Sequence, residues 1–326
     1  MKKCLLLHSL LIVWIVEAQP VAKNFPKRKD DAAFIFHAPT GKFILLGGTT
    51  QTPGQNESDV WSWNGEKWTR SAASGPGSRY FFSPALDTKS NRIFGYGGEG
   101  ADERSLGDVW SFDGTAWSRV ISDDIGTRDH HKMVFAEHIN AFVLYGGNRN
   151  GKEDTVTWLF RDGKFTPLKI KGPGIRYHSG MVYDKYRKKV MLYGGGTKPD
   201  EHWEFDGSRW TKLNTKFNPG RKYYHGMVYC DSLKSVVLHG GWVNQDSRDP
   251  QNAKTPETWF WNGSEWRKVG EHRLFPMALG YDPKRNVVVA YGFTDVYGKP
   301  RDIVLSEWKD GKWVRVANYG PWVDER

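Results

Sequence analysis

The sequence predicts an all-β protein built from six repeated units of four short strands, and two regularities support this prediction. The first is a set of six Asn-Gly or Asp-Gly pairs, each flanked by aromatic residues and each suited to a two-residue type I′ hairpin turn. Their successive glycines lie 49, 49, 44, 56 and 48 residues apart, which is the period of a propeller blade. The second is a glycine pair that precedes five of the six hairpins. The hairpin pairs are Asn64-Gly65, Asp113-Gly114, Asp162-Gly163, Asp206-Gly207, Asn262-Gly263 and Asp310-Gly311.

Each unit contains four segments with strand-like patterns, as the fourth unit illustrates at 176–184, 188–195, 202–207 and 208–213. Alternating apolar residues, β-branched enrichment and Gly-rich boundaries favour four antiparallel strands. Such a sheet cannot cover both of its faces alone, so we expect neighbouring sheets to pack around an axis. Glycine pairs begin at Gly47, Gly97, Gly146, Gly194 and Gly240, and the sixth unit has Gly292-Phe293. The aromatic residues that follow the hairpins are Trp68, Trp117, Phe165, Trp210, Trp266 and Trp313.

The glycine pair, the hairpin and the trailing aromatic residue, in this order, resemble the kelch repeat over roughly residues 32–316. The resemblance, which is to secreted bacterial kelch proteins, implies a closed six-bladed kelch β-propeller of four-stranded antiparallel blades. We place this domain at 32–317, after a polar lead at 19–31 and before a C-terminal tail at 318–326. Strand-like sequence at 34–37 predicts that the ring closes without exchange of a terminal strand. The resemblance assigns no activity, because kelch propellers include enzymes as well as binding proteins.

The first 18 residues have the pattern of a cleavable secretion signal. Lys2 and Lys3 precede an apolar run at 5–16, and small residues follow at Val16 and Ala18. The run is shorter than the roughly 20 residues that a membrane-spanning helix needs. We therefore expect a secreted or periplasmic protein, cleaved after Ala18, without a transmembrane anchor and monomeric. Cys230 would then be the only thiol, and we expect it to be a small buried hydrophobe.

The chain is basic, with 47 Lys and Arg against 37 Asp and Glu and a formal charge of +10. An excess of this sign favours acidic partners through long-range attraction. Nucleic acid is not expected as a partner, because the longest basic run has three residues, at 27–29. The sequence has no HxH, HExxH or CxxC pattern, so neither a metal site nor a cofactor is expected.

The antiparallel strand order places the starts of the innermost strands on one face of the ring, together with the loops between the second and third strands. Basic residues recur at these strand starts, so one mouth of the central channel is expected to carry positive charge. Two roles remain open for the arginines. They could bind an anionic ligand, or they could pair with Asp59, Asp108, Glu201 and Glu257 in a lattice between blades. The candidate ligand-binding residues are Arg79, Arg128, His131, Arg176, His178, Arg221 and His225, with Trp242 as a stacking surface for a sugar.

Three classes of function fit these observations. The first, which we favour, is a secreted binding module that recognises a glycan, an anionic surface polymer or a protein through its loop-rich basic face. The second is a periplasmic sugar-modifying enzyme, either mutarotase-like or oxidase-like, as the kelch resemblance allows. The third is a structural or protein-interaction propeller of the cell envelope. No catalytic residue can be assigned from the sequence.

Overall fold

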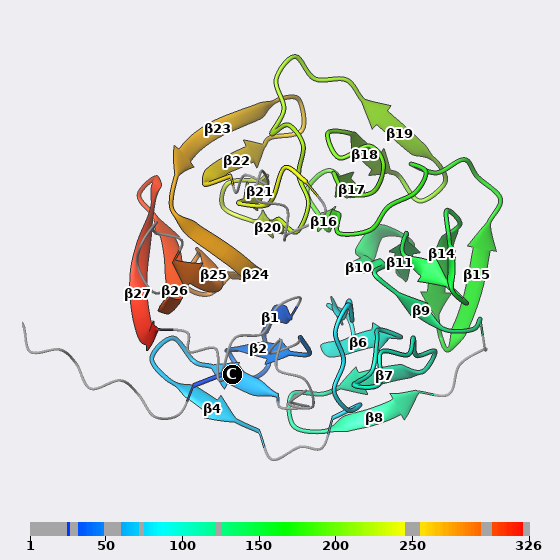
Figure 1. The fold of residues 1–326 in the computed structure, drawn as a ribbon, viewed down its shortest axis with the longest axis horizontal. Helices are drawn as coiled ribbons and strands as arrows, with labels where there is room; N and C mark the ends of the chain where they lie inside the picture. The colour runs from blue at the N-terminus through cyan, green and yellow to red at the C-terminus, as the bar shows by residue number, and fades with distance from the viewer. Residues whose placement is uncertain are drawn as a thin grey trace, which may run out of the picture.

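The computed structural model describes residues 25–26, 32–48, 60–71, 75–120, 125–244, 255–294 and 302–321. In these ranges, the regular elements are six four-stranded antiparallel sheets, one three-stranded sheet and the 3₁₀ helix Glu137–Ile139. The four-stranded sheets stand around a central axis and form a ring (Figure 1). The predicted all-β class and propeller architecture are therefore confirmed. The expected signal peptide at 1–18 lies outside the described residues, within which no helix is long and apolar enough to cross a bilayer.

The six four-stranded sheets follow one another along the chain, and each corresponds to one of the predicted units. The first three consist of β1 (Ala33–His37), β2 (Lys42–Leu46), β3 (Trp61–Trp63) and β4 (Trp68–Arg70); β5 (Ala85–Asp87), β6 (Arg92–Tyr96), β7 (Val109–Phe112) and β8 (Trp117–Val120); and β10 (Lys132–Ala136), β11 (Ala141–Tyr145), β14 (Thr157–Arg161) and β15 (Lys164–Leu168). The last three consist of β16 (Gly180–Asp184), β17 (Lys189–Tyr193), β18 (His202–Phe205) and β19 (Trp210–Leu213); β20 (Gly226–Cys230), β21 (Ser235–His239), β22 (Glu257–Trp261) and β23 (Trp266–Glu271); and β24 (Leu274–Asp282), β25 (Val287–Thr294), β26 (Asp302–Lys309) and β27 (Lys312–Pro321). The small sheet joins β9 (Arg128–Asp129), β12 (Asn148–Arg149) and β13 (Lys152–Glu153).

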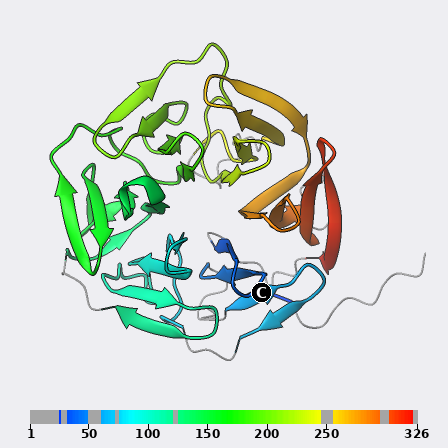
Figure 2. The same ribbon diagram turned by 180° about the vertical axis from the view of Figure 1, so that it is seen from behind.

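Within every four-stranded sheet, the hydrogen-bonded order of the strands is the order of the chain. The first strands lie nearest the axis, and the fourth strands, such as β4, β15 and β23, form the rim (Figure 1). The same ring is seen from behind in Figure 2. We call the face on which the first strands begin the upper face, and the face with the turns between first and second strands the lower face. The upper face also carries the loops between second and third strands.

All six predicted hairpins join a third strand to a fourth strand, but the predicted turn type is right for only two of them. Arg161 pairs with Lys164 around Asp162-Gly163, where φ is 50° and 76°, and the sixth hairpin is alike. In the other four hairpins, the loop has two more residues and only the glycine has a positive φ. There the Asn or Asp side chain accepts backbone N–H groups instead. Asn64 Oδ1, for example, lies 3.0 and 2.9 Å from the nitrogens of Glu66 and Lys67, an arrangement that needs no left-handed Asn.

The aromatic residues that follow the hairpins connect neighbouring sheets. Trp210 is buried, and its Nε1 donates a hydrogen bond of 2.8 Å to Thr157 Oγ1 in the preceding sheet. Trp313 makes the same contact to Thr258, at 2.9 Å. The repeated tryptophans thus belong to the core, where burial of their large surfaces contributes to holding the sheets together.

The ring closes where β1 packs against β24. The first sheet, β1 to β4, and the last sheet, β24 to β27, each consist of consecutive strands of the chain. No terminal strand is therefore exchanged between them, as predicted. Aromatic rings fill this contact: the ring of Tyr291 lies 6.4 Å from that of Phe34 and 5.8 Å from that of Trp68. Phe25, ahead of the first sheet, stacks on Tyr319 of β27 at 4.9 Å. We call this contact between the first and last sheets the seam.

Two further expectations concern single positions. Cys230 is buried at the end of β20, as expected, and its Sγ lies 3.5 Å from Ser232 Oγ. The last strand, β27, continues past the expected domain end at 317 to Pro321.

Candidate functional site

Three of the predicted basic residues are buried and bind partners within their own sheets. Arg79 donates to both carboxylate oxygens of Asp108, at 2.6 and 2.8 Å, and to the carbonyl oxygen of Gly97 at 2.8 Å. Less than 5% of its surface is exposed. The bidentate geometry is that of a strong, charge-assisted pair. The equivalent ion pairs are Arg128–Asp154 at 3.0 Å and Arg176–Glu201 at 2.6 Å.

These ion pairs tie the segment that precedes the first strand of a blade to the segment that precedes the third strand of the same blade. Asp59 lies outside the described residues, but Asp108, Glu201 and Glu257 are paired with basic residues, in each case within one blade and not in the lattice between blades that the sequence allowed. The reason is geometric, since the acidic residue precedes the third strand at the same upper edge. A tryptophan completes each group: Trp110 Nε1 donates to Asp108 at 2.6 Å, and Trp203 Nε1 donates to Glu201 at 2.9 Å. The guanidinium groups of these three arginines are therefore structural.

The fifth sheet has a lysine in the corresponding position. Lys222 is fully buried, with its Nζ 2.9 Å from Glu257 Oε2 and 2.5 Å from Thr255 Oγ1. Arg221, the residue chosen from the sequence, is exposed, and its Nε donates to the Val243 carbonyl at 3.1 Å. Arg221 and Lys222 are adjacent basic residues, and the sequence alone does not show which of the two side chains is buried.

The glycine pairs connect the neighbouring sheets through the backbone. Gly147 N donates to the carbonyl oxygen of Arg176 at 2.6 Å, and Gly98 N donates to that of Arg128 at 2.8 Å. A Cβ atom on Gly147, whose φ is 73°, would lie 2.0 Å from the carbonyl oxygen of Asp129. Only glycine fits there, and this close approach fixes the backbone of the segment that follows Arg128.

Two residues after each of these four basic residues stands an aromatic or imidazole side chain, and together the four form what we call the aromatic arc. All have a left-handed backbone, with φ between 52° and 54°. Bulky side chains rarely adopt this conformation, which persists only where surrounding structure imposes it. The cross-sheet hydrogen bonds of the glycine pairs supply that constraint. The arc consists of Phe81, His130, His178 and Tyr224.

The members of the arc contact one another across four sheets. Phe81 stacks on His130 with ring centroids 3.5 Å apart, and His178 stacks on Tyr224 at 3.9 Å. The two pairs meet edge to face, with His130 and His178 5.0 Å apart. Tyr224 Oη lies 2.9 Å from His178 Nε2, and burial lowers the pKa of His178 to about 2, so this imidazole is neutral. The arc is thus a preorganised, largely uncharged aromatic surface at the upper mouth of the channel.

His130 is additionally oriented by a buried carboxylate. Its Nδ1–H donates to Asp129 Oδ1 at 2.6 Å, and Asn148 Nδ2 donates to the same oxygen at 3.1 Å. Ser105 donates to Asp129 Oδ2. Burial acts to raise the pKa of Asp129, but the hydrogen bonds from His130 and Ser105 outweigh it and hold this pKa below its usual range. An ionised Asp129 thus fixes the orientation of the imidazole through Nδ1.

A second acidic group lies close to His130. Burial raises the pKa of Glu99, while the charge of His130 opposes this rise. Burial and the neighbouring Glu99 together raise the pKa of Tyr80 to about 12, and the two side chains are hydrogen-bonded. The upper mouth therefore combines an oriented imidazole with a carboxyl group that is more readily protonated than usual.

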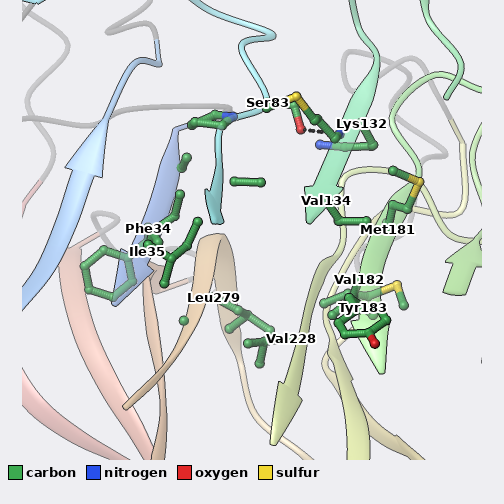
Figure 3. A pocket seen from close by; sticks show the side chains of 18 of the residues that line it. Phe34, Ile35, Ser83, Lys132, Val134, Met181, Val182, Tyr183, Val228 and Leu279 are labelled. Carbon is green, nitrogen blue, oxygen red and sulfur yellow. Dashed lines mark hydrogen bonds between the residues drawn. The ribbon is translucent and has the colours of Figure 1, made fainter. Parts of the chain in front are cut away.

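A cavity of about 680 Å³ runs from the aromatic arc along the inner strands, and Figure 3 shows part of its wall. Its middle is a ring of one residue from each first strand, which we call the apolar waist. All six have a small or aliphatic side chain or none, and each first strand pairs with its second strand along one edge only. The apolar waist consists of Ile35, Ala85, Val134, Val182, Val228 and Gly280.

Lys132 lines the cavity between the aromatic arc and the apolar waist. Lining residues at equivalent positions in other sheets are small: Ala33, Ser83 and Gly180. Among the described residues that line this level, Lys132 is the one with a permanent charge. Burial is the main cause of the lowered pKa values of His131, His178 and His225, and the positive charge of Lys132 lowers all three further. The cavity thus presents a cation above an apolar ring.

The remaining predicted residues lie around this cavity in different settings. His131 and His225 line its wall and are buried, and neither ring nitrogen of either residue has a hydrogen-bond partner in the described part of the chain. The backbone of Trp242 pairs with that of Tyr223, next to the arc, and its ring meets Phe275 edge to face at 5.1 Å. Within the described ranges, no three His, Cys, Asp or Glu side chains are grouped so as to hold a metal ion.

Sequence reasoning identified His178 but missed the rest of the arc, as well as Asp129 and Lys132. A signal was present, because an aromatic or imidazole side chain follows each buried basic residue at the second position. This signal is hard to recognise because the residue type differs between repeats: the arc contains Phe, His and Tyr. Lys132 could have been noticed as a charged residue directly before an apolar inner strand.

Comparisons with known proteins agree with this architecture. No protein-family model and no curated protein matches the sequence. Among solved structures, the chain is similar to that titled "Structure of YjhT", with 17% sequence identity and a TM-score of 0.66. The similarity covers 91% of this chain and 100% of the other. At this identity, the likeness supports the propeller fold of the chain and no more.

Proposed function

We propose that the protein is a secreted kelch-type propeller that acts as a binding module and takes an anionic or saccharide ligand into the upper mouth of its central channel. The observation that carries this proposal is the cavity that begins at the aromatic arc and contains Lys132. Clefts of several hundred Å³ with few convergent polar groups are the usual form of small-ligand sites. Aromatic faces suit the apolar faces of sugars, and a lysine in an enclosed site attracts anions.

The buried arginines change the expected chemistry of this mouth. Because Arg79, Arg128 and Arg176 are paired within their sheets, we assign ligand contact to the aromatic arc and Lys132 instead. The binding face remains the upper one, where the loops between second and third strands surround the channel.

Binding to arrays of glycans and acidic polymers tests the proposal. The wild-type protein is compared with Tyr224→Ala, which opens the arc, and with Tyr186→Ala, which removes a 60% exposed tyrosine from a lower-face turn. We expect saturable binding that Tyr224→Ala weakens at least about tenfold and that Tyr186→Ala leaves unchanged. Absence of binding to every glycan and anionic compound, or loss of binding in Tyr186→Ala alone, would show the proposal to be wrong.

A second candidate is a sugar-modifying enzyme, and the Asp129–His130 pair beside Glu99 favours it. An oriented imidazole and a carboxyl group of raised pKa can act as base and acid without a cofactor. A panel of reducing sugars followed by NMR tests this candidate. The enzyme hypothesis expects anomeric exchange to be accelerated by the wild-type protein and not by His130→Gln or Asp129→Asn, whereas equal rates with and without protein contradict it.

A further inference from the structure

We propose that the protein docks onto an anionic phospholipid bilayer through one side of its lower face, so that the upper mouth of the channel points away from the membrane. The docking surface consists of three turns between first and second strands, at 185–188, 231–234 and 283–286, which we call the basic sector. The strands that lead into these turns, β16, β20 and β24, are neighbours around the axis (Figure 1). The proposal does not depend on the ligand of the channel, because the basic sector and the upper mouth lie on opposite faces of the ring.

The first step of the argument concerns the uneven distribution of charge over the lower face. In the turns of the first three sheets, at 38–41, 88–91 and 137–140, the lysines, arginines and carboxylates are limited to one lysine and one glutamate. The basic sector contains a single acidic residue, Asp231. A charge required by the repeat would recur in every sheet, so the excess on one side belongs to the surface and not to the fold. The basic residues of the sector are Lys185, Arg187, Lys188, Lys234, Lys284 and Arg285.

The second step concerns which of these charges are available to a partner. Three of the six basic side chains are held by carboxylates, as Lys185 is held by Asp231 at 2.5 Å. The other three, Lys188, Lys234 and Lys284, are exposed, and none of them forms an ion pair within the described part of the chain. Ammonium groups of this kind are attracted to an anionic bilayer within about one Debye length, which is about 10 Å at 0.1 M salt.

The third step concerns two apolar side chains on the same surface. Tyr186 and Leu233 are 60% and 42% exposed. Contacts between their turns hold them in place: Lys234 Nζ lies 4.6 Å from the centroid of the Tyr186 ring, and Arg187 Nη1 donates a hydrogen bond of 2.8 Å to the Lys234 carbonyl oxygen. Tyrosine is favoured at the level of lipid headgroups, and burial of leucine at the edge of the acyl chains adds to binding. The basic sector therefore combines the two properties that hold a protein at an anionic membrane.

The geometry favours a bilayer over an acidic protein as the partner. The three turns lie at the same end of the ring, so one flat surface can contact all of them at once. Tyr186 and Leu233 stand on these turns and do not line the cavity. The upper face does not have this uniform sign of charge, because exposed carboxylates occur in its loops at Asp102, Glu103 and Glu153.

Co-sedimentation with vesicles tests the proposal on the mature protein, residues 19–326, because the apolar run at 5–16 would itself associate with lipid. The vesicles consist of phosphatidylcholine alone or of equal parts of phosphatidylcholine and the anionic phosphatidylglycerol. We expect the anionic vesicles to bind at least about tenfold more tightly. An increase in salt from about 0.1 M to about 1 M should remove most of this difference, because the Debye length falls to about 3 Å.

Charge variants locate the docking surface. The double substitution Lys188→Gln with Lys234→Gln should weaken binding to the anionic vesicles at least about tenfold. Its matched control, Lys169→Gln with Lys171→Gln, removes the same charge from exposed positions on the upper face and should leave binding unchanged. Lys188→Arg with Lys234→Arg should retain binding, and this pair keeps the test valid if the glutamine pair does not fold. Thermal melts show which variants are folded.

Aromatic variants separate a bilayer from an acidic polymer. Tyr186→Ala should weaken vesicle binding, whereas Phe217→Ala, which removes a 65% exposed ring from an upper-face loop, should not. Soluble poly-glutamate should bind more weakly than the anionic vesicles, because it offers no apolar layer to Tyr186 and Leu233.

Several outcomes would overturn the proposal. Equal binding to both kinds of vesicle, or equal effects of the two glutamine pairs, would mean that the basic sector does not recognise anionic lipid. Weakening by Tyr224→Ala would place the lipid at the upper mouth instead. Binding of poly-glutamate as tight as that of vesicles, with the same dependence on Lys188 and Lys234 but none on Tyr186, would identify an acidic polypeptide as the partner. Failure of the channel to bind any glycan or anion would contradict the proposed function and leave this proposal standing.

Discussion

Arg128 and Arg221 show that two basic residues at the same edge of the ring can have opposite roles. Arg128 is fully buried between Asp154 and the Gly146 carbonyl, whereas Arg221 is exposed and holds one backbone carbonyl. Removal of one partner from a buried ion pair leaves the other charge without compensation. The position of a guanidinium, rather than its presence, therefore decides whether it contributes to stability.

This difference gives the first prediction. Arg128→Ala should lower the free energy of unfolding by about 3 kcal/mol, because the buried Asp154 then loses its buried cation and keeps Arg149, which is partly exposed, together with the N–H groups of Trp158 and Val156. Arg221→Ala, as the matched control, should change it by less than about 0.5 kcal/mol. Urea unfolding measures both. Equal effects of the two substitutions would mean that the buried pair adds nothing specific.

At the residue scale, the sequence predicted the pairing of arginines with acids but not which residues line the channel. The pairing follows from complementary charges that recur at a fixed place in each repeat. The aromatic arc depends instead on a left-handed backbone at Phe81, His130, His178 and Tyr224, which contacts from neighbouring sheets impose. A local sequence pattern does not show which segments contact one another across sheets, so of the four arc residues only His178 was among the predicted site residues.

Among the elements, the third strands β14 and β22 accept side-chain hydrogen bonds that join one sheet to the next, in addition to the backbone bonds of the glycine pairs. Thr157 at the start of β14 accepts from Trp210 of the following sheet, and Thr258 of β22 accepts from Trp313. Each bond is buried and links strands of two neighbouring sheets. Loss of the acceptor would leave an indole N–H without a partner in the core.

The second prediction concerns this contact. Thr157→Val keeps the shape and the β-branching of the side chain but removes the acceptor, so the free energy of unfolding should fall by about 1–3 kcal/mol. Thr166→Val on β15, where the threonine is exposed, should change it by less than about 0.5 kcal/mol. Chemical denaturation distinguishes the cases, and a stable Thr157→Val would indicate that the tryptophans hold the sheets by burial alone.

The elements themselves were largely predictable. Period-2 alternation, the glycine pairs and the Asn-Gly or Asp-Gly turns mark where strands begin and end, and all six expected units are sheets. The turn geometry was less predictable, because Asn64 and its equivalents can satisfy the backbone through their side chains. The small sheet of β9, β12 and β13 was also missed, since strands of two residues have no periodicity to detect.

For the whole molecule, five buried imidazoles determine how stability responds to acid. Burial lowers the pKa of His202, His225 and His239 to about 3 and that of His178 to about 2, and it holds that of His131 well below its usual value. In the unfolded chain these groups titrate near pH 6.5. Below that pH the unfolded state binds more protons than the folded state, so stability falls as the pH falls.

The third prediction follows from this sign. Between pH 7.5 and 5 the free energy of unfolding should decrease, with each such imidazole contributing up to about 1.4 kcal/mol per pH unit below its unfolded pKa. Glu99 and Glu204, whose pKa values burial raises, act in the opposite direction but are fewer. His202→Gln should make the slope shallower. Urea melts across this range provide the measurement, and a flat profile in the wild-type protein would contradict the assignment of neutral, buried imidazoles.

The seam has a kinetic consequence. Neighbouring sheets join segments close in the chain, whereas β1 and β24 are brought together from opposite ends of the described sequence. Contacts between segments so far apart in the chain form late in folding, because closing the long loop between them costs entropy before the contacts themselves contribute to stability. Until then an open ring would expose the aromatic faces that contain Phe34, Trp68 and Tyr291. Aggregation during refolding should therefore originate at this interface, where two intact but unjoined ends of the ring can each pair with another molecule.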